Sequence, residues 1–590
     1  MEYVDVLIIG SSIAASMTAA YLKQQLPELD VVVLGPRPED ERRPYVGESL
    51  VEPAALFMQE IGLRDYLNST QMTKNGLTFY HKLRPGDPQD RRYSVHAPRR
   101  LYHTAWQLHR PEVDRAVRQR AEELGARMVV GRMEDIEVGT ALRSHRVRAR
   151  GEESTSTFSC RWVIDATGRT RRIGRTVVNY VRPRTGQRSC FWFWLADFEP
   201  FLAHIEMAMR SPAAYDLWQT THHFLGRGYW IWGIPLATRD WQRLISVGIT
   251  FRPDILAHPV RSMEEFLELV DREHPALAMM VRSGNVLNCN VYHEYIYWAD
   301  RVYSEDGWFL VGDAARAVDP LYSNGLSLAT VQAQQIVSII GRQRDGTLSA
   351  GEVDAMDMVW RRFMARQQGD IGRYYEVMHD PFQACMRRYW NVGGWFNTFL
   401  PLWWNGFFSS PAAARLLSRF LQEEDPAAES AWKLFAQASE ALGPALGAAD
   451  FERVPDLDWM LNLRFDWRKE DVPRHLARAI WKRVRLRLAL LRVERYRHVL
   501  QQLPVLMREI ALSCIFRYVL PRMGREVFAS LKPPLPRLAA ANESSAPENA
   551  WRHKLRCQLD DLLTTPDRTR RFCYSLLIAS VARGNATSVA

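Results

Sequence analysis

The stretch "VDVLIIG", Val4–Gly10, decides the fold, because it is an apolar run, interrupted only by Asp5, that ends in a glycine. Such a run predicts a strand that is buried on both faces and followed by a tight turn. Ser12–Gln25 then shows a helical pattern, and "DVVVLG", Asp30–Gly35, predicts a second buried strand. The order of strand, glycine turn, helix and strand is typical of a nucleotide-binding unit with a parallel sheet.

Further strands continue this α/β unit along the chain. The runs "CRWVIDATG" (160–168) and "GWFLVGDAA" (307–315) each predict a strand that ends in a tight turn. Residues 107–130 predict a helix that stops at Gly125 and is followed by a strand. Aromatic, strand-like segments at about 185–300 predict a mostly β layer on the substrate side, inserted into the nucleotide-binding fold.

The length of the chain, 590 residues, is too great for one compact core. After about residue 330 the pattern becomes helical and stays so. We therefore expect a Rossmann-like core over 1–345 and a large helical C-terminal domain over 346–590. The proline- and alanine-rich residues 531–550 predict a loop or linker within the second of these.

Composition restricts the class of protein. Hydrophobic residues make up 47% and charged residues 24% of the chain, as in an ordinary globular protein. The net charge is +10, but no basic tail or nucleic-acid motif accompanies it, so we expect no nucleic-acid partner. The seven cysteines are scattered without a C-x-x-C pair, which predicts a reducing compartment, no disulfide framework and no metal site.

Membrane contact is not expected. The N-terminal "MEYVDVLIIG" begins a strand almost at once and has no signal-peptide pattern, so we expect a cytoplasmic protein. The most apolar window, Val392–Ser410, is interrupted by Pro401, Asn397 and Asn405. It predicts a broken aromatic element, in the core or over an apolar pocket, rather than a membrane span.

The first turn is a poor match to a dinucleotide site. Such a site favours glycine at positions 10, 12 and 15, and only Gly10 matches. Ser12 and Ala15 are small, and we expect them at the cofactor with Gly10. The second strand ends in Gly35, where an acid normally binds the adenosine ribose, so that contact is missing.

Two tryptophans lie two residues apart in "GYWIWGIPL", Gly228–Leu236. In a strand, Trp230, Trp232 and Ile234 share one face. Pro235 has no N–H, so the strand should end or become an edge there. By themselves the two rings indicate either core anchors or the wall of a cavity.

Three further segments resemble a known family when they are taken in order. "HRPEVD" (His109–Asp114), "VIDATG" (Val163–Gly168) and "FLVGDAARAVDP" (Phe309–Pro320) are similar to successive FAD fingerprints of flavin monooxygenases of the hydroxylase type. In that setting Arg110 can neutralise pyrophosphate oxygens, and Asp313 can accept from a ribitol hydroxyl. The resemblance covers roughly residues 4–345.

Within this superfamily, W-x-W-x-I-P matches the fingerprint of flavin-dependent halogenases. The resemblance implies that Trp230 and Trp232 separate the flavin from the substrate. "VDPLYSNG" (Val318–Gly325) is similar to the family's F-x-P-x-x-S-x-G, with Val318 where Phe is usual. This motif implies roles for the residues Pro320 and Gly325 at the flavin, Ser323 in catalysis, and the backbone N–H groups of Asn324 and Gly325 at the halide.

Two more segments carry residues of the family. "TKNGLTFYHK" resembles the segment with the active lysine, for which Lys74 fits best and Lys82 is the alternative. "VGESLVEP" resembles the flavin-contacting G-E-S turn, and the cofactor residues implied there are Arg43, Gly47, Glu48 and Ser49. Tyr322 stands where tryptophan halogenases have a glutamate, so a base of that type is absent.

The resemblance implies a two-component enzyme closest to halogenases of phenols and pyrroles. A separate flavin reductase supplies reduced FAD, O2 gives the C4a-hydroperoxide, and chloride or bromide is oxidised to hypohalous acid. Lys74 then presents the halogen to an electron-rich aromatic molecule, free or bound to a carrier protein. A flavin hydroxylase and a non-catalytic protein with a degenerate flavin site remain as alternatives.

The helical tail carries no such motif. "WKRVRLRLALLRVERYRH" (481–498) predicts a basic amphipathic helix. Its basic residues indicate either the solvated face of a core helix or a docking face for an acidic carrier protein or anionic surface.

Overall fold

The computed structural model describes residues 1–37, 46–82, 92–95, 105–205, 207–208, 216–349, 351–420, 426–442, 472–493 and 499–514. Arg43, the 531–550 segment and the last five residues of 481–498 lie outside these ranges. Within them, no helix is both long and apolar enough to cross a bilayer.

The first sheet has the predicted α/β architecture. Its strand order is β7-β2-β1-β10-β9-β8, with β19 also paired to β10, and the contacts among β7, β2, β1, β10 and β19 are all parallel. The strands are β1 (Glu2–Ile9), β2 (Val31–Gly35), β7 (Arg127–Val130), β8 (Arg132–Glu137), β9 (His145–Arg150), β10 (Thr155–Asp165) and β19 (Trp308–Leu310). The apolar runs of β1, β2 and β10 are buried because helices cover the sheet, namely α1 (Ile13–Gln25), α4 (Arg110–Glu123) and α8 (Gly325–Arg344).

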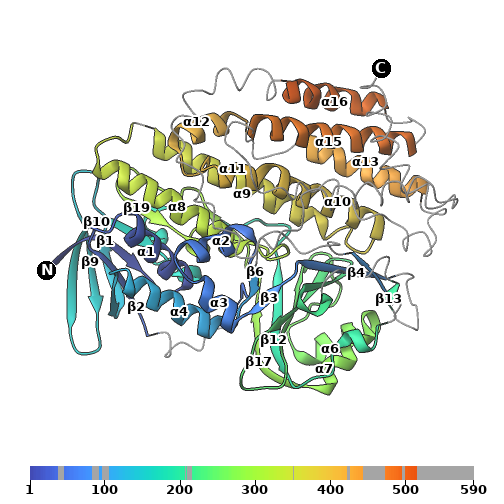
Figure 1. The fold of residues 1–590 in the computed structure, drawn as a ribbon, viewed down its shortest axis with the longest axis horizontal. Helices are drawn as coiled ribbons and strands as arrows, with labels where there is room; N and C mark the ends of the chain where they lie inside the picture. Colours follow the sequence, from blue (N-terminus) through green and yellow to red (C-terminus); the bar gives the residue numbers. More distant parts are fainter. Residues whose placement is uncertain are drawn as a thin grey trace, which may run out of the picture.

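The second sheet contains the mostly β layer predicted for about 185–300. Its order is β13-β5-β4-β14-β15-β16-β12-β17. These strands are β4 (Leu77–Lys82), β5 (Arg92–Val95), β12 (Ser189–Ala196), β13 (Met207–Ala208), β14 (Thr221–Gly226), β15 (Tyr229–Leu236), β16 (Leu244–Phe251) and β17 (Asn285–Tyr292). Beyond the sequence prediction, β4 and β5 join from upstream, and the helices α6 (Met263–Glu273) and α7 (Pro275–Ser283) lie beside the sheet (Figure 1).

Shorter elements connect the two sheets. They are α2 (Glu52–Glu60), α3 (Arg64–Thr70), β3 (Met72–Lys74), β6 (Ala105–Gln107), α5 (Gly174–Val177), β11 (Tyr180–Val181), β18 (Tyr297–Ala299) and β20 (Arg316–Ala317). β3 pairs with β6, and β18 lies between β11 and β20 in a small third sheet.

The two-tryptophan strand behaves as its alternation predicts. Trp230 and Trp232 belong to one buried cluster, whereas Tyr229 and Ile231 pack with α6 and α7 on the other face of the sheet. β15 extends one residue past Pro235 and pairs with β16 throughout, but its pairing with β14 stops at Gly233. Pro235 therefore lies where β15 has a local free edge, as its missing N–H requires.

The described residues after 345 are mostly helical, as predicted, and form the layer at the top of Figure 1. Its helices are α9 (Glu352–Tyr374), α10 (Pro381–Gly394), a π-helical turn (Trp395–Phe399), α11 (Leu400–Trp404), α12 (Pro411–Phe420), α13 (Pro426–Leu442), α15 (Val472–Val493) and α16 (Val499–Cys514). The aromatic window Val392–Ser410 is buried here, and Trp403 shares one hydrophobic cluster with Val6 of β1. Arg487 of the basic helix is buried and pairs with Glu509 at 3.0 Å, so this cation faces the core.

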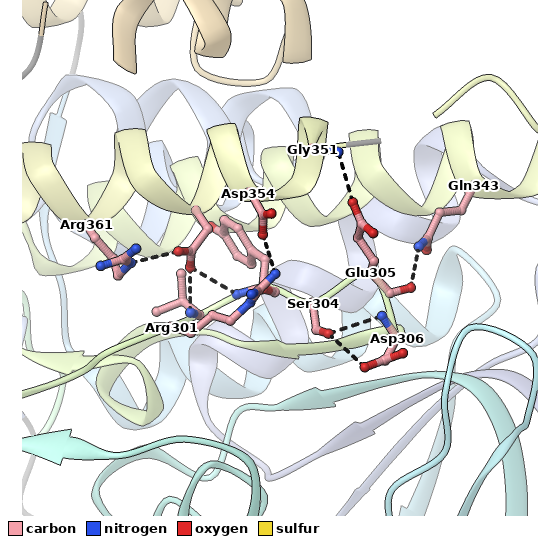
Figure 2. A network of polar contacts seen from close by, with 11 residues as sticks. Arg301, Ser304, Glu305, Asp306, Gln343, Gly351, Asp354 and Arg361 are labelled. Atoms are coloured by element: carbon pink, nitrogen blue, oxygen red, sulfur yellow. Dashed lines mark hydrogen bonds and ion pairs between the residues drawn. The ribbon is translucent and has the colours of Figure 1, made fainter. Parts of the chain in front are cut away.

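Polar contacts also fasten α9 to the loop before β19, as Figure 2 shows. The buried carboxylate of Asp357 accepts from the N–H of Val302 at 2.7 Å and from Nε of Arg361 at 2.7 Å. The same loop reaches α9 through an ion pair between Arg301 and Asp354. The helical layer and the first sheet are therefore held together by a common apolar core and by hydrogen bonds.

Candidate active site

The first turn is closed by contacts at the carboxyl end of the parallel sheet. Gly10 has φ +121°, and a Cβ there would lie 2.5 Å from the carbonyl oxygen of Ala166, so only glycine fits. Ser12 caps α1, accepting from the N–H of the buried Ala15 at 3.3 Å and donating to the Ala166 carbonyl at 2.9 Å. The three predicted residues thus shape the turn and point the start of α1 toward the nucleotide edge.

The missing ribose acid has a steric explanation. A Cβ at Gly35 would lie 2.7 Å from the backbone nitrogen of Ser11, so no carboxylate side chain fits at this position. The close approach of β2 to the first turn therefore excludes the contact that other dinucleotide sites make.

Arg110 and Asp313 lie near enough for their charges to interact. Asp313 is exposed, yet the protein around it removes enough hydration to raise its pKa, while the positive charges of Arg169 and Arg110 act to lower it. Arg110 makes a bidentate pair with Asp114 at 2.7 and 3.0 Å and donates to the carbonyl of Val46 at 2.5 Å. It therefore also supports the turn that begins at Val46.

The G-E-S turn is bonded to the second sheet. Gly47 has φ +86°, and the hydroxyls of Ser49 and Thr221 are 2.9 Å apart. The buried Glu48 accepts from Nε1 of Trp194 at 2.7 Å, and burial raises the pKa of its carboxyl to about 7. This turn therefore places an acid that is partly protonated near neutrality between the two sheets.

The Val318–Gly325 loop has the features of a ligand site. Ser323 adopts a left-handed conformation with φ +57°, and Asn324 is the N-cap residue of α8. Asn324 is fully buried, and neither Nδ2 nor Oδ1 of its side chain has a hydrogen-bond partner among the described residues. A Cβ at Gly325 would be 3.8 Å from Val318, so the start of α8 is not crowded. Unpaired buried polar atoms beside a helix N-terminus fit a bound anionic or polar group, and with the first turn they fit FAD and a halide.

The two candidate lysines have different surroundings. Lys74 ends β3, is 7% exposed and donates from Nζ to the carbonyl of Leu50 at 2.9 Å. Burial lowers the pKa of Lys74, and the negative charge of Glu52 opposes this shift. Lys82 instead pairs with Glu273 at 2.6 Å in a partly exposed setting at the end of β4.

Glu52 is itself buried and held from the helical layer. Its Oε2 accepts from Nε1 of Trp395 at 3.1 Å. Burial raises the pKa of the Glu52 carboxyl, whereas the charge of Lys74 lowers it. A residue of the helical layer thus orients the carboxylate that acts on the lysine.

Buried aromatic rings pack against one another on one face of the second sheet. The rings of Trp230 and Trp232 are 5.6 Å apart, and Nε1 of Trp232 donates to Oγ of Ser246 at 3.2 Å. The ring of His223 lies 5.5 Å from that of Trp230 and stacks on Phe79 at 4.4 Å.

His223 connects this ring cluster to Lys74 and to the Val318–Gly325 loop. Burial lowers the pKa of the imidazole to about 3, with a further contribution from the charge of Lys74 and opposing hydrogen bonds to the backbone of Thr78 and Leu321. The imidazole is therefore neutral at physiological pH. Sequence reasoning gave no role here to His223, to Trp395 of the aromatic window, or to Tyr375, whose hydroxyl accepts from Nε1 of Trp230 at 2.8 Å. None of the three stands in a recognisable motif.

No cluster of His, Cys, Asp and Glu suited to a metal ion occurs in the described part of the chain. The site is thus an aromatic and polar one, built from both sheets and from the helical layer.

Comparison with known proteins gives consistent results. The family described as "FAD binding domain" matches residues 3–357. Flavin-dependent halogenase chlA of Dictyostelium discoideum is 26% identical over 382 residues, which cover 58% of this chain and 60% of that protein. The 1H-pyrrole-2-carbonyl-[peptidyl-carrier protein] chlorinase of Pseudomonas fluorescens is 25% identical over 352 residues, which cover 56% of this chain and 74% of that enzyme. The chain thus spans about three fifths of the slime mould relative.

Solved structures share the fold. Halogenase PltM in complex with phloroglucinol and FAD has a TM-score of 0.57 at 19% identity, covering 76% of this chain and 94% of PltM. The myxobacterial chondrochloren halogenase CndH has a TM-score of 0.52 at 22% identity, covering 64% of this chain and 83% of CndH. The predicted resemblance to flavin-dependent halogenases and the predicted FAD-binding fold are confirmed by these matches.

Proposed function

The chain belongs to the FAD binding domain family, and from its similarity to named halogenases we propose that it is a flavin-dependent halogenase of electron-rich aromatic molecules. The observation that carries the proposal is the buried amine of Lys74, whose charge acts on His223, a ring 5.5 Å from that of Trp230. A hydroxylase, which transfers oxygen directly from the flavin to the substrate, has no use for such an amine. The named relatives, which include halogenases of pyrroles bound to carrier proteins, support the same activity.

Different residues of the site bind the halide and separate the flavin from the substrate. Reduced FAD, when bound, supplies the reaction with O2 that makes an oxygen atom available for attack by chloride or bromide. Asn324 and the backbone N–H groups at the start of α8 hold the halide, which leaves as hypohalous acid. Trp230 and Trp232 keep water and the aromatic substrate away from the flavin side.

Lys74 then transfers the halogen in one of two ways. As an ammonium it donates a hydrogen bond to hypohalous acid, which makes the halogen more electrophilic. As a neutral amine it forms an N–halogen bond and releases water, with the amine proton leaving on the oxygen. Its lowered pKa makes the neutral amine more accessible than in an exposed lysine.

The partners follow from the same proposal. A separate reductase in the cytoplasm supplies reduced FAD, and the substrate is a phenol or pyrrole, free or attached to a carrier protein. Tyr322 stands where tryptophan halogenases have a glutamate, so no base of that type assists the halogenation. The substrate ring must therefore be electron-rich by itself.

The test is an assay of the purified protein with FAD, a flavin reductase, a nicotinamide cofactor and chloride or bromide. The substrates are a panel of phenols and pyrroles, each free and as a carrier-protein thioester. We expect a product that contains the halogen and disappears when the halide is omitted. A product that contains added oxygen instead would identify a hydroxylase, and a failure to bind FAD would identify a degenerate site.

A further inference from the structure

The hydroxyl of Tyr375, at the end of α9, joins Trp230 to the Val318–Gly325 loop that precedes α8. Nε1 of Trp230 donates to the hydroxyl of Tyr375 at 2.8 Å, and this hydroxyl donates to Oδ2 of Asp319 at 2.6 Å. All three side chains are buried. Because a phenol has one proton to donate, these two contacts fix its orientation completely.

The backbone of Tyr375 holds the same strand. Its carbonyl accepts from the N–H of Gly228 at 3.0 Å, in the turn just before β15. The end of α9 thus contacts the two-tryptophan strand twice, once at the backbone where the strand begins and once at the first tryptophan ring.

Asp319 extends these contacts into the Val318–Gly325 loop. Its N–H donates to Oε1 of Gln368 in α9 at 2.8 Å, and its Oδ1 accepts from the N–H of Leu321 at 3.2 Å. Arg188 lies 3.3 Å from Oδ2 and balances the buried charge. The loop then turns through the left-handed Ser323, a conformation that persists only where neighbouring contacts enforce it.

We propose that Tyr375 is a positioning residue whose hydroxyl sets the spacing between the Trp230 ring and the Val318–Gly325 loop. This inference rests on the proposed function for its chemical meaning, because the spacing determines whether oxidised halogen moves toward Lys74 or escapes. Removal of the hydroxyl leaves the indole N–H and one carboxylate oxygen buried without their partner, so both segments lose a constraint together.

The test compares Tyr375→Phe with a matched control, Tyr374→Phe. Tyr374 is the neighbouring residue, is equally buried, and donates to the carbonyl of Ala384 at 2.8 Å rather than to the loop. The first measurement is hydrogen–deuterium exchange of the protein without flavin. For Tyr375→Phe we expect several-fold faster exchange in both 229–236 and 318–325, and for Tyr374→Phe no change in either segment.

The second measurement is the ratio of halogenated product to hydrogen peroxide in the assay with reduced FAD. We expect a several-fold fall for Tyr375→Phe at unchanged FAD affinity, and a ratio near that of the wild type for Tyr374→Phe. A merely structural role would lower the melting temperature without changing this ratio.

The outcomes separate this inference from the proposed function. Faster exchange in only one segment, or in neither, overturns the inference whatever the activity. Faster exchange in both, with no halogenated product from the wild type, supports the coupling and overturns the proposed function. If Tyr375→Phe fails to fold, Trp230→Phe tests the same link, because it should also raise exchange in 318–325.

Discussion

Lys74 combines burial with a nearby carboxylate, and this environment determines its chemistry. Burial removes water from around the charged ammonium of Lys74, so the pKa of Lys74 falls. Glu52 limits that fall, and Trp395 fixes the position of Glu52. The resemblance of "TKNGLTFYHK" to the family's lysine segment pointed to Lys74, but no local pattern indicates a carboxylate held by a tryptophan more than three hundred residues later.

Replacement of the lysine tests the assignment directly. We expect Lys74→Ala to reduce halogenation by at least about 100-fold, because the halogen loses its carrier, while FAD binding is retained. Lys82→Ala is the control: it breaks a partly exposed ion pair worth at most about 1 kcal/mol and should leave product formation unchanged. Product yield and flavin titration measure both effects. Loss of halogenation in Lys82→Ala alone would transfer the role to that residue.

Glu52→Gln should shift the pH dependence of halogenation to lower pH. The substitution keeps an acceptor for Trp395 but removes the negative charge that favours the Lys74 ammonium. The pKa of Lys74 therefore falls further, and the limb of the pH–rate profile that belongs to it moves down. A limb that rises with pH indicates a neutral amine that forms an N–halogen bond, and a limb that falls indicates an ammonium. Glu60→Gln, at the opposite end of α2 from Glu52, is the control and should leave the limb in place. A limb that also stays in place in Glu52→Gln would contradict the pairing.

Glu48 makes the stability of the protein depend on pH. Its pKa is raised to about 7 in the folded state, above the 4.5 of an exposed glutamate. Between these values the folded protein keeps a proton that the unfolded chain releases, so stability falls as the pH rises from about 4.5 to 7. We expect Glu48→Gln, which keeps the acceptor for Trp194, to remove a loss of about 2–3 kcal/mol across this window. Melting temperatures of the flavin-free protein from pH 5 to 8 measure it, and a constant difference between the two proteins would be inconsistent with this titration.

Among the elements, β15 shows how far a periodic pattern determines a site. Alternation predicted which face each of its side chains takes, and Pro235 predicted the local edge, because both depend only on backbone geometry. The partner of Trp230 was not predictable, because Tyr375 comes from a helix 145 residues away that has no motif. Likewise the sequence shows that Arg110 and Asp114 are four residues apart, a spacing that allows an ion pair on a helix. That Arg110 forms this pair is seen only in the folded helix.

Phenylalanine variants of the two tryptophans test whether β15 forms a wall. Trp230→Phe and Trp232→Phe should each cost about 1–3 kcal/mol of stability, because a smaller ring leaves a void. In addition, the ratio of halogenated product to peroxide should fall, because water reaches the flavin side. Trp162→Phe is the control: Trp162 is also buried and bonded, to Gln343 at 2.7 Å, but in the first sheet. An equal loss of melting temperature in all three variants with an unchanged ratio would reduce the pair to core anchors.

At the scale of the whole molecule, the helical layer and the first sheet share one hydrophobic cluster. The strand–turn–helix segments and the change to helical pattern after about residue 330 were readable from the sequence. The shared core was not, because Trp360, Phe399 and Trp403 belong to one cluster with residues of β1 more than three hundred positions away. Sequence patterns report local geometry, whereas the docking of two layers depends on the shape of both.

The shared core predicts a single cooperative unfolding transition for both layers. Asp357→Ala should lower its midpoint by an amount equivalent to about 2–4 kcal/mol, because it leaves a buried N–H at Val302 and the guanidinium of Arg361 unpaired. Asp354→Ala, in the same network (Figure 2), removes a half-exposed ion pair and should cost less than about 1 kcal/mol. Calorimetry distinguishes the outcomes: two separate transitions, with only one shifted by Asp357→Ala, would make the layers independent.

The contacts of Trp395 with Glu52 and of Tyr375 with Trp230 also matter while the protein is being made. A ribosome releases the chain from its N-terminus, so the residues of both sheets emerge before these two partners do. A nascent chain that already bound flavin would have an incomplete ring wall and an unsupported lysine. Because the supporting side chains are translated after the sheets, Trp230 and Lys74 reach their folded surroundings only once residues 375–395 have left the exit tunnel and docked.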